Sequence, residues 1–600
     1  MWGTAEFTRF VAVTVAFAAI LMGGSAQAED YRLNFPPILT MSPKGVNVQT
    51  GRFDYSQKEF SIGPLSVDLR YTSKTYNDVY AFTTIAPSKI DFPVNGVARS
   101  LRGTVDWESR NDWQGTPFEV LSVRIGDSLL QYTYTGTWPN PTFTPWNLEA
   151  VSWKVVKSGS NYTATNKSGD VYTFVDHAAL PTNSPHPDRV KLLSNAVFAD
   201  GHRLDYSYGT SAELRTVTSN KGFAVVFDYV SATQTITACG YNLSVTYVDA
   251  NSTCAAATLK TSYAFSNASG NLRLISATDT GGNVSNWTYA GTMLDCITFP
   301  ASATCRFQNS YGNQPGETVD STMPDQVRKQ TMPTGEIWLY TYSFPQGGDQ
   351  PPLLPGQVRT TYGNIYDPLG NHSLVQYKNG VASAMTTPAG TVTYTFNGLC
   401  PLSITYPEGN ALQFVSSNSC NIGSKTAVPK PGSPLSSTIV SVAYPAELTC
   451  DFATRLCDKP TSKTDELGRQ TDYTFDTANG QILTETLPAI GGIRPQTRFT
   501  YAQRYAWVKN SGGTYVQAAT PVWVLTQKSI CKSGAASGAG CVTPSDEVRT
   551  TYDYGPNSGP NNLFLRGTVE DSTGAALRTC YGYDWRGNKV SETRPRAGLA

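Results

Sequence analysis

A short pattern of polar, glycine and aromatic positions recurs along the chain. In each copy a glycine is followed five positions later by an aromatic residue, and strand-forming residues fill the interval. Glycine allows the positive φ of a tight hairpin turn, so each glycine predicts a turn and each interval predicts a strand. The copies are Gly169/Phe174, Gly201/Tyr206, Gly222/Phe227, Gly282/Trp287, Gly335/Tyr340, Gly409/Phe414 and Gly468/Tyr473.

In most copies a second aromatic residue follows the first by two positions, as Tyr208 follows Tyr206. Alternate residues of a strand lie on the same face of a sheet, so both rings should share one face. Rings on adjacent strands can then stack, which contributes roughly 0.2–1 kcal/mol for each cross-strand pair. Where the copies are evenly spaced, the interval is about one hairpin of two strands and two turns.

These patterns predict an all-β protein that contains a long antiparallel array of β-hairpins. We expect the array at residues 196–600, interrupted by loops and insertions. Residues 29–195 lack clear copies but alternate as strands do, which predicts a β-rich N-terminal domain. The alternative is an ordinary β-sandwich with many glycine turns, but the repeated register of the copies favours the array.

The composition excludes several classes of protein. Aromatic residues make up 11% and charged residues only 15% of the 600 residues, which argues against a disordered chain. The 51 glycines and 37 prolines argue against a coiled coil. The 46 basic and 46 acidic side chains balance, so no electrostatic footprint for nucleic acid is present.

The N-terminus has the features of a signal peptide. Arg9 precedes an apolar run over residues 10–22, and Ala26-Gln27-Ala28 supplies the small-residue spacing of a cleavage site. Thirteen apolar residues are too few to span a bilayer as a helix, which needs about 20. We therefore expect residues 1–28 to be removed and the protein to be secreted or held at the cell surface, without a membrane span after cleavage. A weak membrane anchor is the alternative.

Ten of the eleven cysteines lie close to another cysteine in the sequence. In an oxidising compartment such spacings suit disulfides that staple a hairpin or its loop, although spacing does not fix the connectivity. Cys580 has no neighbour. The absence of a C-x-x-C motif and the scatter of the four histidines argue against a zinc site. The neighbouring cysteines are Cys239/Cys254, Cys296/Cys305, Cys400/Cys420, Cys450/Cys457 and Cys531/Cys541.

Three segments place an aspartate shortly before a turn glycine. Two of them are residues 366–371, YDPLGN, and residues 465–469, DELGR. The third and most specific is YGYDWRGNK at residues 581–589, which contains Tyr583, Asp584 and Gly587. With these segments the repeat resembles the tyrosine–aspartate (YD) repeat of the Rhs family. Residues 46–71 also resemble the opening strands of such proteins. Related proteins carry a self-cleavage motif that contains Asp-Pro, and residues 367–370 match it in part. Asp367, Pro368 and Gly370 suit a type I turn, however, which explains the Asp-Pro here better than a cleavage motif does.

The resemblance implies a shell in which the hairpin array curls into an open or partly closed wall. Related bacterial Rhs toxins, the shells of insecticidal toxin complexes and teneurins wind such a sheet into a hollow cocoon, and the bacterial members hold a C-terminal toxin inside. The self-cleavage motif and toxin that usually follow are not found before Ala600, so we expect this chain to be a truncated shell portion.

No sequence motif for catalysis, a cofactor or a metal is present. The chain lacks a nucleophile elbow, a Walker loop, a zinc-protease helix and an EF-hand loop. We therefore expect a non-enzymatic shell whose partner is a polypeptide cargo or a cell-surface molecule. The alternatives are an adhesin that binds carbohydrate through exposed aromatic residues, and a secreted hydrolase with unrecognised acids. Asp465 and Glu466 form one such acidic pair, but they lie at a predicted turn.

Overall fold

The computed structural model describes residues 32–595 except residues 37, 39–40, 73–96, 100–102, 112–116, 127, 138–139, 148, 181–189, 267–272, 292, 313–325, 344–359, 379, 418, 446–451, 536–539 and 572–575. Within these residues the regular elements are β-strands and three short 3-10 helices, which confirms the all-β prediction. The 3-10 helices are η2 (Glu149–Ser152), η4 (Phe452–Thr454) and η5 (Pro544–Asp546). No helix in the described part of the chain is both long and apolar enough to cross a membrane.

The N-terminal part contains a small sheet and a separate group of strands. The small sheet has three strands, β1 (Asp54–Ile62), β2 (Leu65–Thr72) and β3 (Val97–Arg99). The strands of the group are β4 (Gly103–Asn111), β5 (Pro117–Ile125), β6 (Ser128–Thr135), β7 (Thr142–Pro145), β8 (Trp153–Ser158), β9 (Asn161–Asn166), β10 (Val171–Val175) and β11 (Val190–Val197).

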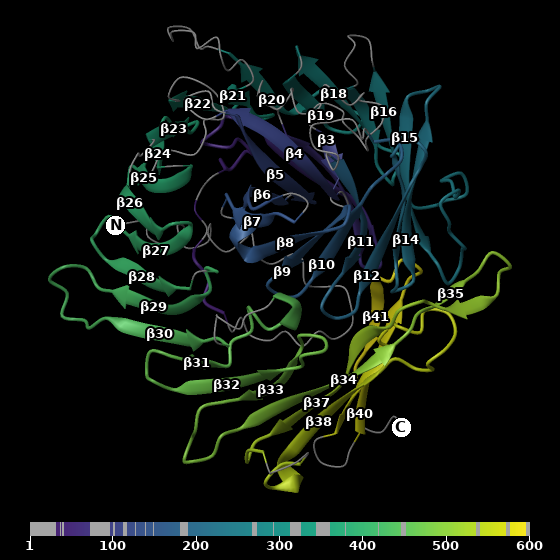
Figure 1. The fold of residues 1–600 in the computed structure, drawn as a ribbon, viewed down its shortest axis with the longest axis vertical. Coiled ribbons are helices and arrows are strands. Elements are labelled where there is room, and N and C mark those ends of the chain that lie inside the picture. Colours follow the sequence, from purple (N-terminus) through teal and green to yellow (C-terminus); the bar gives the residue numbers. More distant parts are fainter. Residues whose placement is uncertain are drawn as a thin grey trace.

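From β11 onward the strands form a long curved sheet, here called the wall (Figure 1). A separate hairpin, β35 (Trp507–Lys509) and β36 (Tyr515–Gln517), interrupts it. The first wall strands after β11 are β12 (Arg203–Tyr208), β13 (Leu214–Ser219), β14 (Phe223–Val230), β15 (Thr235–Asn242), β16 (Lys260–Ser266), β17 (Arg273–Thr278), β18 (Val284–Ala290), β19 (Met293–Thr298), β20 (Cys305–Tyr311), β21 (Val327–Thr331), β22 (Ile337–Ser343) and β23 (Thr360–Tyr366).

The second half of the wall continues in the same antiparallel manner. Its strands are β24 (His372–Lys378), β25 (Val381–Thr387), β26 (Gly390–Asn397), β27 (Cys400–Thr405), β28 (Ala411–Ser416), β29 (Ile422–Val428), β30 (Thr438–Ala443), β31 (Ser462–Thr464), β32 (Gln470–Phe475), β33 (Ile482–Thr486), β34 (Gln496–Arg504), β37 (Val522–Cys531), β38 (Glu547–Asp553), β39 (Gly567–Asp571), β40 (Ala576–Tyr583) and β41 (Lys589–Thr593).

Strand pairing in the wall follows the order of the sequence. Each described strand from β12 to β40 pairs with the strand before it and the strand after it, with β34 joined directly to β37. The ladder branches at β11, which pairs with β4 as well as with its neighbours in the wall. Among the described strands the wall is an open sheet, because its last strand, β41, pairs with β40 alone. The predicted antiparallel hairpin array is therefore confirmed as an open sheet. The predicted domain boundary at residue 196 falls within β11.

An aspartate organises the best-defined hairpin turns. Asp367 Oδ1 accepts hydrogen bonds from the amides of Leu369 (2.9 Å) and Asn371 (2.8 Å), and Oδ2 accepts one from the Asn371 side chain (2.8 Å). Gly370 has φ +81° and donates its amide to the Asp367 carbonyl at 2.9 Å. The carboxylate thus holds a tight turn that glycine completes. The same arrangement recurs at Asp279, Asp465 and Asp584.

In several hairpins an aromatic residue near the end of a strand faces an irregularity in the next strand. At Tyr289 the pairing with β19 shifts, so that Leu294 opposes Tyr289 and Asp295 is an extra residue. Such a β-bulge bends a strand and increases its twist, which explains how regularly spaced bulges curve the wall. The same shift occurs at Tyr208, Tyr311, Tyr377, Phe396, Phe475 and Tyr583.

Strands β4–β11 surround a core of their own, and Figure 1 shows β4–β9 within the outline of the ring. Trp107 packs edge-on against Tyr134 at 5.3 Å and donates its indole N–H to Tyr162 at 3.3 Å. Val105, Leu121 and other aliphatic residues fill the space around these rings. This unit is joined to the wall through β11, which belongs to both.

Among the described residues, four disulfides with both cysteines placed join neighbouring cysteines along the wall. They link Cys239 to Cys254, Cys296 to Cys305, Cys400 to Cys420 and Cys531 to Cys541. Cys457 is buried, and its predicted partner Cys450 lies outside the described residues. Cys580 is free and exposed.

Candidate functional site

The candidate functional surface is the inner face of the wall, on which another part of the chain packs. It is covered by residues 32–72, here called the lining segment, which include β1 and β2. From its N-terminal end the lining segment contacts β28 first and then β22, β20, β18 and β14. Up to Gly63 it therefore runs from later to earlier wall strands, and β2 then runs back, so that Tyr71 again contacts Trp287 of β18.

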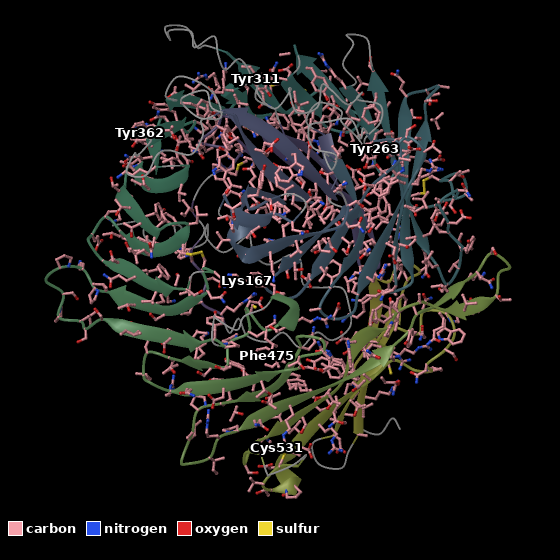
Figure 2. All side chains as sticks on the ribbon, in the orientation of Figure 1. Lys167, Tyr263, Tyr311, Tyr362, Phe475 and Cys531 are labelled. Carbon is pink, nitrogen blue, oxygen red and sulfur yellow. A yellow bond between two sulfur atoms is a disulfide. The ribbon has the colours of Figure 1, made fainter. Side chains whose placement is uncertain are left out.

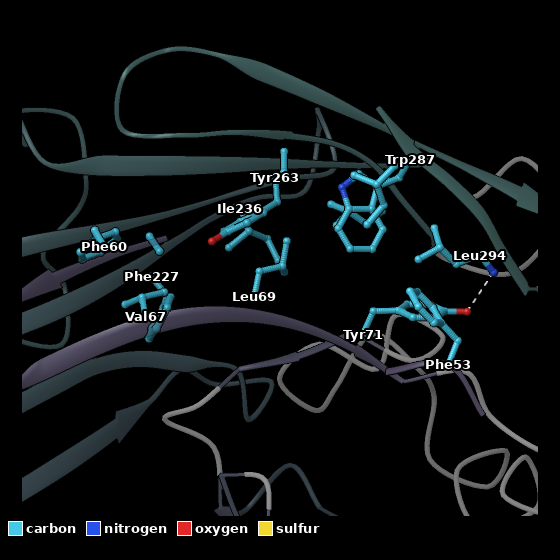
Figure 3. Close-up of a cluster of buried hydrophobic side chains, with 14 of the residues drawn as sticks. Phe53, Phe60, Val67, Leu69, Tyr71, Phe227, Ile236, Tyr263, Trp287 and Leu294 are labelled. Carbon is cyan, nitrogen blue, oxygen red and sulfur yellow. Dashed lines mark hydrogen bonds between the residues drawn. The ribbon is translucent and has the colours of Figure 1, made fainter. Parts of the chain in front are cut away.

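Aromatic and aliphatic side chains carry most of the contact between the lining segment and the wall. Phe53 lies 4.6 Å from the ring of Phe307, and Tyr55 and Tyr71 both meet Trp287 edge-on at about 6 Å. Figure 3 shows Phe53, Tyr71 and Trp287 together with neighbouring aliphatic side chains such as Leu69 and Ile236. Figure 2 places Tyr263 and Tyr311 on the part of the wall that faces this core. This packing is that of a hydrophobic core rather than a solvent channel.

Further toward the N-terminus, the lining segment packs on a second part of the wall. Phe35 lies 5.0 Å from Phe414 and 6.0 Å from Phe396. Leu33 is buried in the same cluster as Phe414 and Ile404. The wall thus packs on the lining segment through a second apolar cluster, which includes aliphatic residues of β29 and β30.

Buried hydrogen bonds fix the register of the lining segment on the wall. Ser42 Oγ lies 3.2 Å from the hydroxyl of Tyr340, which donates to Gln330 Oε1 at 2.7 Å. Tyr71 accepts the Leu294 amide at 2.9 Å, the bond drawn as a dashed line in Figure 3. Burial raises the pKa of Tyr340, so its hydroxyl keeps its proton and remains able to donate.

One wall glycine admits the lining backbone. A Cβ on Gly363 of β23 would lie 1.8 Å from the carbonyl oxygen of Val48. The approach is possible only because glycine has no side chain, since real Cβ atoms do not come within 3.0 Å of such an atom.

A polar junction anchors the start of the lining segment. Arg32 pairs with Asp458 at 3.1 Å, and Ser168 of the β9–β10 turn donates to the same carboxylate oxygen at 2.6 Å. Lys167 of that turn also bonds to Asn421 Oδ1 at 3.1 Å. A cavity of about 320 Å³ lies among these residues. The junction ties the lining segment, the β4–β11 unit and the wall together.

The two ends of the wall meet along a second contact region, here called the seam. Turns at residues 198–202, 219–222 and 242–246 pack against residues 505–523, 561 and 585–586. Trp523 donates its amide to the Asp200 carbonyl and Lys509 donates to Leu243, both at 2.8 Å. Asn242 Nδ2 donates to the Trp585 carbonyl at 2.7 Å. Hydrogen bonds between turns and loops, rather than a strand ladder, therefore join the early wall to the late wall.

The structure brings some of the aromatic residues predicted from the repeat together and separates others. Phe227, Trp287 and Tyr340 are buried in one core with the lining segment, and Tyr206 packs against it. Phe414 lies in the core around Phe35, and Tyr473 lies in a third cluster with Phe499. Tyr583 packs on Phe564 at 4.9 Å near the seam. The turn glycines Gly201, Gly222, Gly282, Gly335, Gly409, Gly468 and Gly587 all have positive φ.

The repeat pattern did not identify the lining segment or the seam. The resemblance of residues 46–71 to opening strands predicted strands there, but it did not show which surface they cover. Gly363 and Ser42 lie outside the repeat, so their roles depend on contacts between residues far apart in the sequence.

The described residues contain no group of three or more side chains positioned to hold a metal ion. The acidic pair considered in the sequence lies at a hairpin turn, where the Asp465 carboxylate bonds to the turn amides and to Arg469. This arrangement lowers the pKa of Asp465, chiefly through the backbone hydrogen bond from Arg469. The hydrogen bonds of the Asp465 carboxylate therefore stabilise its own turn.

Comparisons with known proteins give matches at the level of structure. No family model matches the chain, and no curated protein matches its sequence. A crystal structure of TcdB2-TccC3 without its hypervariable C-terminal region matches 90% of this chain with 11% identity and a TM-score of 0.26. The Photorhabdus luminescens Tc holotoxin pore with the TccC3-D651A mutation matches 90% with 11% identity and a TM-score of 0.28. This chain spans only about 30% of the length of those chains.

Proposed function

We propose that this protein is an exported, non-enzymatic β-shell that encloses or presents polypeptide. The observation that carries the proposal is the occupied inner face. A wall built from repeated hairpins holds an extended segment of its own chain, residues 32–72, through aromatic packing and buried hydrogen bonds. A surface with these properties suits extended polypeptide.

The resemblance of the turns to YD repeats supports the same proposal. The turns at Asp367, Asp465 and Asp584, which belong to the three resembling segments, share one geometry in which the aspartate holds the turn and a glycine with positive φ completes it. In this reading the wall excludes proteases from what lies inside, and the disulfides stiffen it. The cargo would be a polypeptide such as a C-terminal toxin. Export through the N-terminal signal is part of the proposal, because residues 1–31 lie outside the described residues.

Protease protection tests the proposal. A test polypeptide fused after Ala600 should resist added proteinase K when the full chain is folded. The same fusion should be digested after the seam is weakened by Asn242→Ala, which removes the hydrogen bonds to Asn561 and Trp585. Complete digestion of the test polypeptide while the wall stays intact would contradict enclosure. Glycan binding that is lost when exposed aromatic residues are mutated would favour the adhesin instead.

A further inference from the structure

The lining segment contains a hairpin whose turn reaches both ends of the wall. Strands β1 and β2 close on each other through the two-residue turn Gly63-Pro64, with Ile62 paired to Leu65. Among the described strands they form a sheet with β3 and share no ladder with the wall. We call residues 62–65 the tip. Ile62 and Leu65 are buried, so the tip is held in place chiefly by packing.

On the early wall, the tip packs against Phe223. Gly63 has φ +51°, and a Cβ there would lie 2.1 Å from a ring atom of Phe223, closer than real Cβ atoms come to a neighbour. Phe223 begins β14 and is itself buried, so its ring has little space in which to move away. This contact therefore requires glycine at the tip.

On the late wall, the tip is bonded to the hairpin of β40 and β41. Gly63 donates its amide to the Arg586 carbonyl at 2.7 Å. Arg586 lies in the aspartate turn of that hairpin, where the Asp584 carboxylate accepts the Arg586 amide at 2.9 Å. A Cβ on Gly587 of the same turn would lie 3.2 Å from Phe223 and 3.6 Å from Gly63. The most specific copy of the repeated turn is thus the one that receives the tip.

The early wall grips the same turn beside the tip. Asn242, which pairs with Phe223 across β14 and β15, donates to the Trp585 carbonyl at 2.7 Å. The next carbonyl along the chain is the one that accepts the Gly63 amide. Phe564 of the late wall stacks on Phe223 at 6.1 Å. The tip therefore lies at the place where the two ends of the wall meet, and it contacts both.

We propose that the lining hairpin is a latch, whose tip holds the two ends of the wall together so that the seam opens when the hairpin leaves the inner face. The tip contacts both ends only while they are together, so its binding favours the closed arrangement. The coupling is reciprocal, so closure of the seam also favours the docked hairpin. The latch depends on these contacts alone and holds whether or not the wall encloses cargo.

Hydrogen exchange in the full chain can separate opening of the seam from loosening of the lining segment. The amides of Trp523 and Lys509, here called the seam amides, donate across the seam. The amide of Val327 donates to the Gly51 carbonyl at 2.9 Å, which reports on the lining segment away from the tip.

Gly63→Ala tests the latch at the tip. The added methyl group does not fit against Phe223, so exchange at the seam amides should rise at least about fivefold while exchange at Val327 stays unchanged. The matched control is Gly398→Ala in the β26–β27 turn. Gly398 has a similar φ of +59°, but a Cβ there would meet nothing within 4 Å. It adds the same backbone strain without touching the seam, so its seam amides should exchange as in the wild type.

Asn220→Ala tests the same coupling from the other side and leaves the tip intact, so it decides the question even if Gly63→Ala does not fold. It removes the bond between Asn220 and Thr520 (3.0 Å), which does not involve the tip. A reciprocal latch requires faster exchange at the Gly63 amide together with the seam amides, and unchanged exchange at Val327. A Gly63 amide that stays protected while the seam amides exchange faster overturns the proposal. So does unchanged seam exchange in Gly63→Ala, or an equal rise at Val327.

Discussion

At the scale of the residue, glycines in this wall fall into two groups that backbone φ separates. Gly370 has φ +81°, and a Cβ there would meet nothing within 4 Å, so glycine is needed for the shape of the turn. Gly363 has no positive φ, but a Cβ there would meet the Val48 carbonyl at 1.8 Å. The repeat reveals the first group, whereas the second group becomes visible only when the lining segment is in place.

Gly363→Ala should therefore loosen the lining segment without changing the turns. Forcing a methyl group against Val48 should cost about 1–3 kcal/mol, the usual range for overpacking a core. Thermal unfolding should begin at a lower temperature, and trypsin should cut at Arg52 sooner than in the wild type. Gly423→Ala is the control, because its Cβ would meet neighbours only at an ordinary 3.7 Å. Equal behaviour of the two variants would show that the lining segment does not press on β23.

At the scale of the element, several of the repeated hairpins share an aspartate at the turn, and several share a bulge opposite an aromatic residue. The carboxylate of Asp367 bonds to Asn371 and to turn amides, and although slight burial opposes it, these hydrogen bonds lower its pKa. Hydrogen bonds from Asn283 likewise lower the pKa of Asp279. The turns are therefore held by the charged form of the aspartate.

Acid should weaken these turns, and a comparison of the wild type with an Asp→Asn variant at several pH values can show this. A carboxyl group with a lowered pKa stabilises the fold above its unfolded value of about 3.9, and that stability is lost as pH falls through the folded pKa. Asp279→Asn with Asp367→Asn should lower the unfolding temperature at neutral pH and leave a smaller difference from the wild type near pH 3. The comparison needs thermal unfolding at several pH values. A constant difference across that range would contradict the assigned role of the charge.

The element scale is also where the sequence was most informative. A tight turn requires glycine, and rings on one face of a strand require a spacing of two residues. Both requirements concern neighbouring residues only, so Gly468 and Tyr473 could predict their hairpin without information about distant parts of the chain. The bulge at Tyr289 and the covering of Trp287 by Tyr55 involve other strands. Such contacts could not be predicted, because no local pattern specifies which distant segment covers a face.

At the scale of the whole molecule, the seam determines whether the curved wall behaves as one body. Its bonds join residues about 300 positions apart, as between Asn220 and Thr520 (3.0 Å), and they involve turns and loops rather than a ladder. Such contacts open more easily than paired strands, since few backbone bonds must break together. The seam is therefore the part of the wall that should respond first to a change of conditions.

The ionisable cluster at the seam predicts which condition matters. His202 stacks on Phe198 and lies 2.9 Å from Ser219 Oγ, beside the ion pair of Asp200 and Lys221. Burial and the Lys221 ammonium lower the pKa of His202 to about 3, although the Asp200 carboxylate opposes this shift. The folded protein thus holds the imidazole neutral. Because the unfolded imidazole takes up a proton near pH 6.5, stability is lost as pH falls from about 6.5 toward 3.

Seam opening should therefore increase in mild acid. At pH 5 the opening equilibrium of the turn that carries His202 should rise by up to about 30-fold over its value at pH 7.5. Hydrogen exchange at the amides of Trp523 and Lys509, corrected for the intrinsic pH dependence, reports this opening because both amides donate across the seam. His202→Gln should abolish the rise, whereas His372→Gln, at an exposed histidine that begins β24, should preserve it. If seam exchange in the wild type does not change between these pH values, the neutral imidazole does not hold the seam.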